Sequence, residues 1–214
     1  MTYRIARTRR WIIAGVLLMS LLTYAAYLCS PALRMQLHGR QLDELSQVQR
    51  VDAHRYDQSW FDAARLGRVD ILQALHEAQY PIDSRTSSGY TATILAAYDD
   101  HPEALDYLLG AGADACQQDR SGNTALMGAL YKGNLVVARR LLATRCPVDQ
   151  INNAGETALS FAALFGRQDM MRELVARGAD PNHADIHGDT PLAVVMKQGN
   201  GDSATVLRQL GARR

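Results

Sequence analysis

Four glycines recur at a constant spacing of 33 residues, and each one opens the same short motif. A threonine follows each glycine by two positions, and a mainly apolar segment follows the threonine. A constant period of this length predicts one structural unit that is repeated along the chain. The matching positions are Gly89, Gly122, Gly155 and Gly188; Thr91, Thr124, Thr157 and Thr190; Ala96, Ala129 and Ala162; and Gly133, Gly166 and Gly199.

Each residue type in the repeat suits a helical hairpin. A threonine at the head of a helix accepts hydrogen bonds from the first free amides, and a glycine before it suits the positive φ of a tight turn. The alanines let paired helices approach closely, and the apolar pairs Leu108-Leu109, Leu141-Leu142 and Leu174-Val175 fill the space between copies. Because one copy cannot bury its own apolar side, the copies must stack.

The repeat resembles the ankyrin repeat, a β-turn finger followed by two antiparallel helices. Endings such as Gly112-Ala113-Asp114 and Gly178-Ala179-Asp180-Pro181-Asn182 add to the resemblance, which covers residues 58–214. It implies an all-α, ankyrin-repeat solenoid of about five repeats, with an incomplete first copy from Gln58. The last copy departs from the pattern, because Asn200-Gly201-Asp202-Ser203 replaces a good helix start, as we expect for a terminal repeat.

A long apolar segment precedes the repeats. Residues 11–29 carry no charge, and a helix of 19 residues is about 28 Å long, close to the ~30 Å of a membrane's hydrocarbon core. Four arginines lie in residues 1–10, which the positive-inside rule places in the cytoplasm. The sequence thus predicts an N-terminal transmembrane helix as an uncleaved signal anchor, with the repeats across the membrane.

Two other interpretations of residues 11–29 stay open, a cleaved signal peptide and a buried hydrophobic helix. A signal peptide usually has an apolar region of about 7–15 residues and small residues at its cleavage site. The bulky exit Tyr27-Leu28-Cys29 does not fit that pattern, which favours the anchor. Residues 31–57 are expected to form a helical stalk or a cap on the first repeat, and 58–214 the repeat domain.

The resemblance also implies which positions are left to a binding partner. Scaffold positions are constrained, whereas the finger tips and the outer part of each first helix are free to vary, and the fold would place both on one concave surface. Tyrosine and phenylalanine at free positions are typical of binding interfaces, although such rings can also simply cover a neighbouring helix. The expected partner-binding residues are Tyr90, Tyr98, Asp99, Arg120, Asn123, Tyr131, Lys132, Glu156, Leu164 and Phe165.

Charge and motifs argue against other kinds of function. Residues 31–214 contain 19 basic and 22 acidic residues, a net charge of −3, which lacks the basic footprint of a nucleic-acid-binding protein. The sequence has no phosphate-binding loop, nucleophile elbow or zinc-protease helix, so we expect neither an enzyme nor a cofactor or small-molecule substrate. His183 and His187 flank Asp185 at a spacing that binds metals on helices, but they fall on a turn, which favours a polar finger.

Two cysteines leave a question open. Cys116 and Cys146 fall near the closing loops of consecutive repeats, and an exported location would permit a disulfide. Pairing needs Cα atoms about 4.4–6.8 Å apart, which repeat stacking does not guarantee. The alternatives are free thiols or small core residues.

The general character of the sequence predicts a bacterial inner-membrane protein with one transmembrane segment and its repeat domain in the periplasm, where it binds a protein; in a eukaryote the same layout would give a lumenal type II protein. Exported ankyrin-repeat proteins include immunity proteins that mask a toxic periplasmic enzyme such as a lipase, and a membrane tether would keep the inhibitor near such a toxin. The alternative is an assembly factor or chaperone-like scaffold for a resident periplasmic enzyme, such as an antioxidant one. Both roles rest on analogy of fold.

Overall fold

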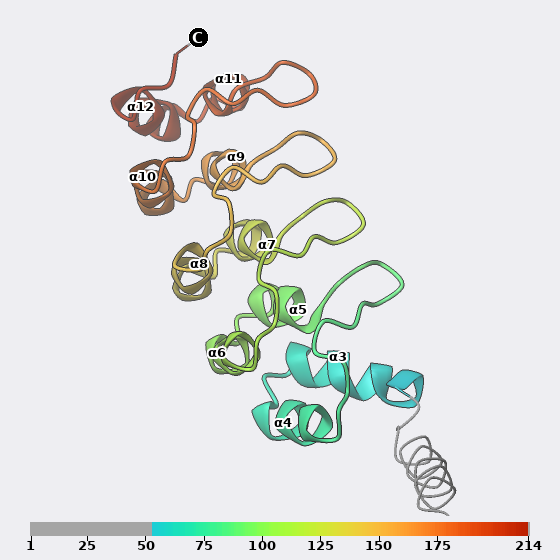
Figure 1. Cartoon of the computed structure of the whole chain (residues 1–214). Helices are drawn as coiled ribbons and strands as arrows, with labels where there is room; N and C mark the ends of the chain where they lie inside the picture. Colours follow the sequence, from blue (N-terminus) through green and yellow to red (C-terminus); the bar gives the residue numbers. More distant parts are fainter. Residues whose placement is uncertain (1–52, 214) are drawn as a thin grey trace, which may run out of the picture. The chain divides into compact units, whose positions relative to one another are not determined.

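A computed structural model describes residues 53–213, which form five successive helix pairs after a short 3-10 helix, Ala53–Tyr56 (Figure 1). No strand occurs among these residues, so the described part is all-α, as the sequence predicts. The pairs are α3 (Asp57–Arg65) with α4 (Val69–Glu77), α5 (Ala92–Tyr98) with α6 (Pro102–Gly110), α7 (Ala125–Lys132) with α8 (Leu135–Leu142), α9 (Ala158–Leu164) with α10 (Gln168–Ala176), and α11 (Pro191–Lys197) with α12 (Gly201–Gln209).

The helix pairs stack in chain order. Each first helix packs on the first helix of the next pair, from α3 to α11, and the second helices α4 to α12 form a parallel row behind them. A long finger precedes each first helix from α5 onward and projects away from the second helices (Figure 1). This arrangement is the solenoid that the 33-residue period predicts.

The threonine of each repeat caps its first helix as expected. The side-chain oxygens of Thr91, Thr124, Thr157 and Thr190 each accept a hydrogen bond from the amide three residues later. The finger glycine is needed for packing as well as for its backbone conformation. Gly89 has a φ of +83°, and a Cβ there would lie 2.7 Å from the backbone nitrogen of Arg120 in the next finger.

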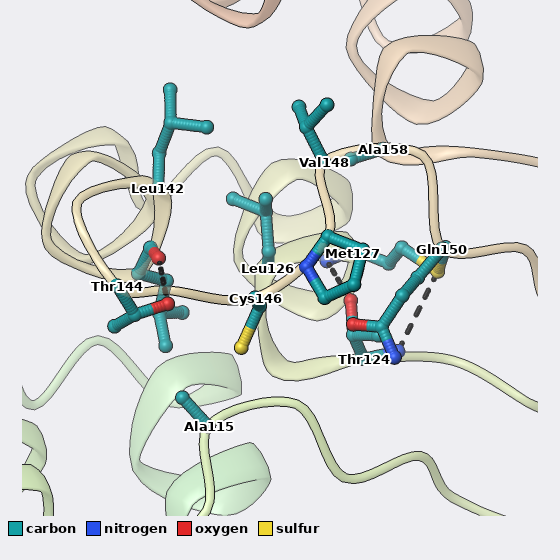
Figure 2. A pocket seen from close by; sticks show the side chains of 12 residues that line it. Ala115, Thr124, Leu126, Met127, Leu142, Thr144, Cys146, Val148, Gln150 and Ala158 are labelled. Carbon is teal, nitrogen blue, oxygen red and sulfur yellow. Dashed lines mark hydrogen bonds between the residues drawn. The ribbon is translucent and has the colours of Figure 1, made fainter. Parts of the chain in front are cut away.

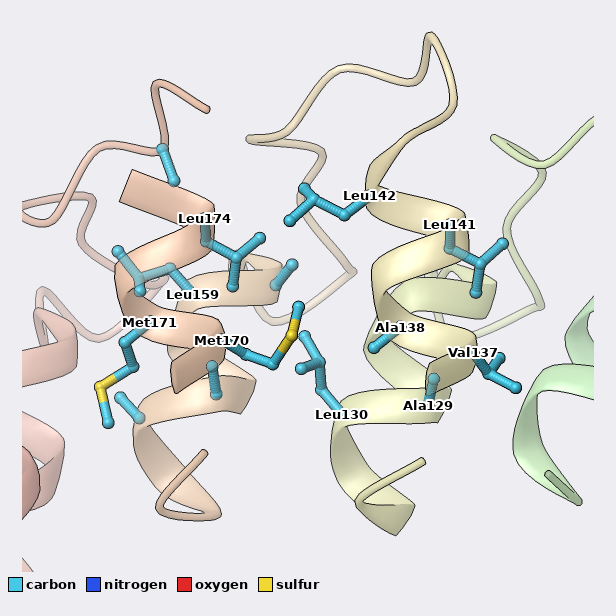
Figure 3. Packing of buried hydrophobic residues seen from close by; sticks show 14 of the residues in the cluster. Ala129, Leu130, Val137, Ala138, Leu141, Leu142, Leu159, Met170, Met171 and Leu174 are labelled. Carbon is cyan, nitrogen blue, oxygen red and sulfur yellow. The ribbon is translucent and has the colours of Figure 1, made fainter. Parts of the chain in front are cut away.

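Side chains between neighbouring pairs form the core. Leu130, Met170 and Leu174 are fully buried, and Leu141 is only 3% exposed. Figure 3 shows Leu130 and Met170 pointing toward each other from adjacent pairs, α7/α8 and α9/α10. The core therefore lies mainly between successive repeats, which explains why one repeat cannot be stable alone.

The last repeat corrects one expectation. The segment from Asn200 to Ser203 does begin a regular helix, α12, and Asn200 caps it by accepting a hydrogen bond from the Ser203 amide at 3.1 Å. The interpretation of this segment as a poor helix start was wrong, because asparagine is among the most favourable N-cap residues.

A disulfide joins Cys116 to Cys146, with Cα atoms 5.3 Å apart. It settles the question that the sequence left open, and it links the loops that close the second and third pairs. Figure 2 shows the Cys146 sulfur directed toward the loop that carries Ala115, next to Cys116.

The disulfide lies where the sequence departs from the hydrogen-bonding pattern of the other repeats. At the matching place in other repeats, the side chains of Asp83, Asp149 and Asn182 accept a hydrogen bond from a backbone amide 31 residues later, at 2.6–3.3 Å. Cys116 holds this place in its own repeat, and the residue 31 positions later is Pro147, which has no amide proton. The covalent bond therefore replaces the missing hydrogen bond between repeats.

The helix end beside the disulfide is also irregular. The amides of Ala113, Ala179 and Ala212 each close a second helix by donating to a carbonyl five residues earlier, after a glycine with positive φ. Within residues 53–213, Cys146 makes no such bond to Leu141, and the residue before it is an arginine. The disulfide thus holds a loop that lacks the usual helix-closing bond.

Several sequence predictions lie outside the described residues. These are the cytoplasmic segment 1–10, the transmembrane anchor 11–29 and nearly all of the stalk 31–57. Within residues 53–213, no helix has the length and apolar character that crossing a membrane requires.

Candidate protein-binding face

An aromatic row runs across three repeats on the exposed side of the first helices. The rings of Tyr98 and Tyr131 stack at an interplanar angle of 14° with centroids 6.0 Å apart. Phe165 meets Tyr131 edge-on, at 82° and 4.9 Å. Tyr98 and Tyr131 are 38% and 45% exposed, so their rings present large surfaces to solvent. The three predicted residues therefore form one continuous feature, here called the aromatic row.

The backbone beneath the aromatic row is held by the next repeat. The Asn134 side-chain amide donates to the carbonyls of Ala97 and Tyr98, each at 3.0 Å. Arg167 does the same one repeat later, donating to Leu130 at 3.1 Å and Tyr131 at 3.3 Å. These bonds fix the ends of α5 and α7, so the tyrosines occupy defined positions before any partner arrives.

A chain of polar side chains lies along the fingers, beside the aromatic row. Asp119 Oδ1 accepts the amides of Ser121 and Asn123 at 2.8 and 2.9 Å. In the next finger, the Asn152 side-chain amide donates to Asn123 Oδ1 at 3.0 Å and to Glu156 Oε2 at 2.9 Å. The predicted residues Asn123 and Glu156 therefore belong to one ordered network that connects two fingers.

The other predicted residues take different positions. Lys132 Nζ lies 4.9 Å from the centroid of the Tyr98 ring, a cation–π contact. Asp99 and Arg120 are exposed, and Leu164 is half-buried. These three residues lie close in sequence to the aromatic row or on a neighbouring finger. Among the described residues, none of them makes a stacking or cation–π contact with its rings.

A hollow of about 260 Å³ opens between the aromatic row and the fingers. The residues that line it come from three consecutive repeats, which shows that the first helices and fingers share one face, here called the inner face. Sequence reasoning identified four of them and missed the rest. The lining residues are Tyr90, Ile94, Tyr98, Asp119, Asn123, Thr124, Gly128, Tyr131 and Phe161.

Gly128 accounts for much of this hollow. The residues one repeat before and after it are Leu95 and Phe161, and Val194 follows in the last repeat. Gly128 is the fourth residue of α7 and has no side chain where these other repeats carry an apolar one, and an added Cβ would lie 3.6 Å from the Tyr98 ring. The sequence shows that a glycine replaces a larger residue at this position of the repeat. That the glycine leaves a hollow follows only from the aromatic rings that surround it in the structure.

The histidine finger has no metal-binding geometry in the described residues, where no cluster of three or more histidine, cysteine or acidic side chains could hold an ion. His183 Nε2 lies 3.0 Å from the carbonyl oxygen of Gly155. The Asp185 carboxylate accepts the amides of Asp189 and His187, and these bonds hold its pKa below the usual value. The segment is thus a polar finger turn.

The fold and the inner face together define a repeat-built scaffold that offers a rigid surface for a macromolecule. The family model for ankyrin repeats, in three copies, matches residues 60–150 and 138–213. The chain therefore belongs to the ankyrin-repeat family, whose members are generally non-enzymatic scaffolds that bind protein partners. No curated protein matches the chain at a significant level.

Proposed function

We propose that this protein is a membrane-tethered scaffold that holds a partner protein on its inner face, on the non-cytoplasmic side of a bacterial inner membrane. The aromatic row carries the proposal. Three aromatic rings in contact lie on three consecutive repeats, and two of them, Tyr98 and Tyr131, present large surfaces to water. Tyrosine and phenylalanine are enriched in protein interfaces, and tyrosine is among the residues that dominate their binding energy.

The disulfide supports the proposed compartment. Cytosolic proteins are kept reduced, whereas disulfides persist in the periplasm and other exported locations. The bond between Cys116 and Cys146 stands where one inter-repeat hydrogen bond and one helix-closing hydrogen bond of the other repeats are missing, so oxidation contributes directly to the stack. This fits the arginine-rich start and apolar segment 11–29, which predict export of the repeat domain.

Crosslinked capture from the native membrane tests the proposal. The full-length chain should retain one partner, and simultaneous replacement of Tyr98, Tyr131 and Phe165 by serine should remove it. The control replaces Val136, an exposed residue of a second helix, by serine and should leave capture intact. Equal capture by the triple variant would overturn the assignment of the inner face.

The compartment is tested in intact cells. In a Cys29→Ser variant, which leaves Cys116 and Cys146 as the two cysteines of the chain, a membrane-impermeant thiol reagent should label both cysteines only after reduction. Labelling without reduction would contradict the disulfide, and protection of the reduced thiols by the inner membrane would contradict a periplasmic repeat domain.

The finer role that we propose is that of an immunity protein, which neutralises a toxic enzyme delivered to the same compartment. A rigid preformed face and a membrane tether suit an inhibitor that must act at once near the membrane. A strain lacking this protein should die when it meets toxin-armed sibling cells. Survival of that strain, together with a lower activity of a resident periplasmic enzyme, would instead favour an assembly factor.

A further inference from the structure

The hollow beside Gly128 has the size of a site for one side chain. Its volume of about 260 Å³ lies below the ~300–1,000 Å³ of pockets that take drug-sized ligands. Three repeats contribute to it, and the side chain that fills the same register in the other described repeats is absent here. A partner that covers the inner face would therefore place one protruding side chain in this hollow.

The walls of the hollow are aromatic. Tyr90, Tyr98, Tyr131 and Phe161 all line it, and aromatic rings attract cations through their faces. The Tyr98 ring already holds the Lys132 ammonium group at 4.9 Å, which shows that the aromatic row accommodates positive charge.

One edge of the hollow carries a carboxylate, that of Asp119, which can accept further hydrogen bonds. Asp119 Oδ1 accepts two backbone amides, whereas Oδ2 has, among the residues that the structure describes, only the Asn123 side-chain amide, at a long 3.5 Å. A carboxylate offers about four acceptor sites, so Oδ2 retains room for a further donor. An apolar guest would cover this oxygen and leave it without water or a partner, which is unfavourable.

The surroundings favour a positive guest as well. Asp99 and Asp100 are exposed at the end of α5, directly after Tyr98, and form no ion pair within the described residues. Residues 53–213 together hold 15 basic and 19 acidic side chains. The face also carries the basic residues Arg120 and Lys132, but the net charge of −4 over residues 53–213 favours the approach of a basic partner segment.

We infer that the hollow receives an arginine side chain from the partner protein. The guanidinium group is planar, stacks on aromatic rings and donates paired hydrogen bonds to a carboxylate, and its apolar stem suits the tyrosine walls. The guest would lie between the rings of Tyr98 and Phe161 and donate to Asp119 Oδ2. This inference rests on the proposed function, since it names the chemistry of the partner at the inner face.

Binding of small probes to the full-length chain, purified in detergent, tests the inference. N-acetylarginine amide is titrated and followed by amide shifts in proton–nitrogen NMR spectra, with the leucine and phenylalanine amides in parallel. The arginine probe should shift the amides of residues that line the hollow, and the apolar probes should bind more weakly. Tighter binding of either apolar probe, or no shift with arginine, would overturn the inference.

Asp119→Asn isolates the carboxylate. The variant should fold, because Asn152 holds the matching position in the next finger and accepts the same two amides at 2.9 Å. It should weaken the arginine probe about tenfold, the loss of one charge-assisted hydrogen bond. The matched control, Asp185→Asn, changes the equivalent residue of the last finger and should leave affinity unchanged. Equal affinity of the Asp119→Asn variant and the parent would refute the pairing.

Gly128→Leu tests the hollow itself. It restores the side chain that Leu95 provides one repeat earlier, so it should keep the fold and abolish probe binding. Gly110→Leu is the matched control, because Gly110 ends α6 with nothing within 4 Å of an added Cβ. Arginine-probe binding that survives Gly128→Leu would show that the probe sits elsewhere and overturn the assignment. If the crosslinked partner is still captured by Gly128→Leu but lost by the triple aromatic variant, the proposed function stands and the arginine site falls.

Discussion

Removal of the Cys116–Cys146 disulfide should weaken the middle of the stack more than its position in a surface loop suggests. The bond closes a loop with a sequence separation of 30 residues. Chain entropy for a loop of that length gives about 3.6 kcal/mol of stabilisation at 25 °C. Since whole domains are stable by about 5–15 kcal/mol, this is a large share of the total. The structure adds a second reason, because Cys116 and Pro147 cannot form the side-chain-to-amide hydrogen bond that joins the neighbouring repeats at this register.

The test variant is Cys116→Ser combined with Cys146→Ala. Alanine at 146 restores the residue of the matching positions 113 and 179, so the change adds no bulk. Urea unfolding of the full-length chain, followed by far-ultraviolet circular dichroism, should show the loss of about 3.6 kcal/mol. The transition should also broaden, because stacks lose cooperativity where the coupling between neighbouring repeats is weakened. Dithiothreitol should have the same effect on the parent and none on the double variant.

Asp149→Ala provides the contrast. It removes the hydrogen bonds from the Asp180 amide to the Asp149 carboxylate, the equivalent link one repeat later. Its expected cost is about 0.5–1.5 kcal/mol, well below that of the disulfide. Overlapping unfolding curves for the oxidised and reduced parent would refute the reasoning, since they would mean that the stack does not depend on the covalent link.

Four further changes have clear expected outcomes. Leu141→Ala removes a side chain that is 3% exposed and should cost about 2–5 kcal/mol in urea unfolding; an unchanged midpoint would remove Leu141 from the core. Tyr131→Ala should weaken partner binding by more than about 1 kcal/mol while leaving the melting temperature nearly unchanged, and unfolding instead would assign the ring to the core. Gly128→Ala should stabilise the chain by about 0.5–1 kcal/mol, because alanine loses less conformational entropy than glycine in a helix and the new methyl group has room, 3.6 Å from the Tyr98 ring; a lower melting temperature would contradict the open space. Burial, with a hydrogen bond to Asp57, raises the pKa of Tyr80 to about 12, so the folded state holds the phenol proton more tightly than the unfolded state does. The stability that this proton contributes should be fully present below about pH 10 and be lost between about pH 10 and 12. The free energy of unfolding of Tyr80→Phe should fall less steeply over that range.

The inner face depends on both kinds of information. The register of 33 residues places Tyr98 and Tyr131 at matching positions, so their proximity followed from the repeat alone. The contact of Phe165 with Tyr131 did not follow, because Phe165 lies one position off that register and reaches Tyr131 only through the turn after α9. The sequence shows Gly128 at a position where other repeats have a larger side chain. The missing side chain leaves a hollow only because residues from three repeats surround it in the structure.

The amino-acid sequence by itself determined the helical hairpin, its threonine caps and the need to stack, because these depend on residue types at a fixed period. Tertiary structure alone decided the pairing of Cys116 with Cys146 and the shape of the hollow. The physical reason is that a period tells which residues occupy equivalent places, whereas bonding and burial depend on ångström-scale distances between side chains of different repeats. Those distances are set by how the helices pack, and one residue out of register, such as Pro147 or Gly128, changes what its neighbours can do.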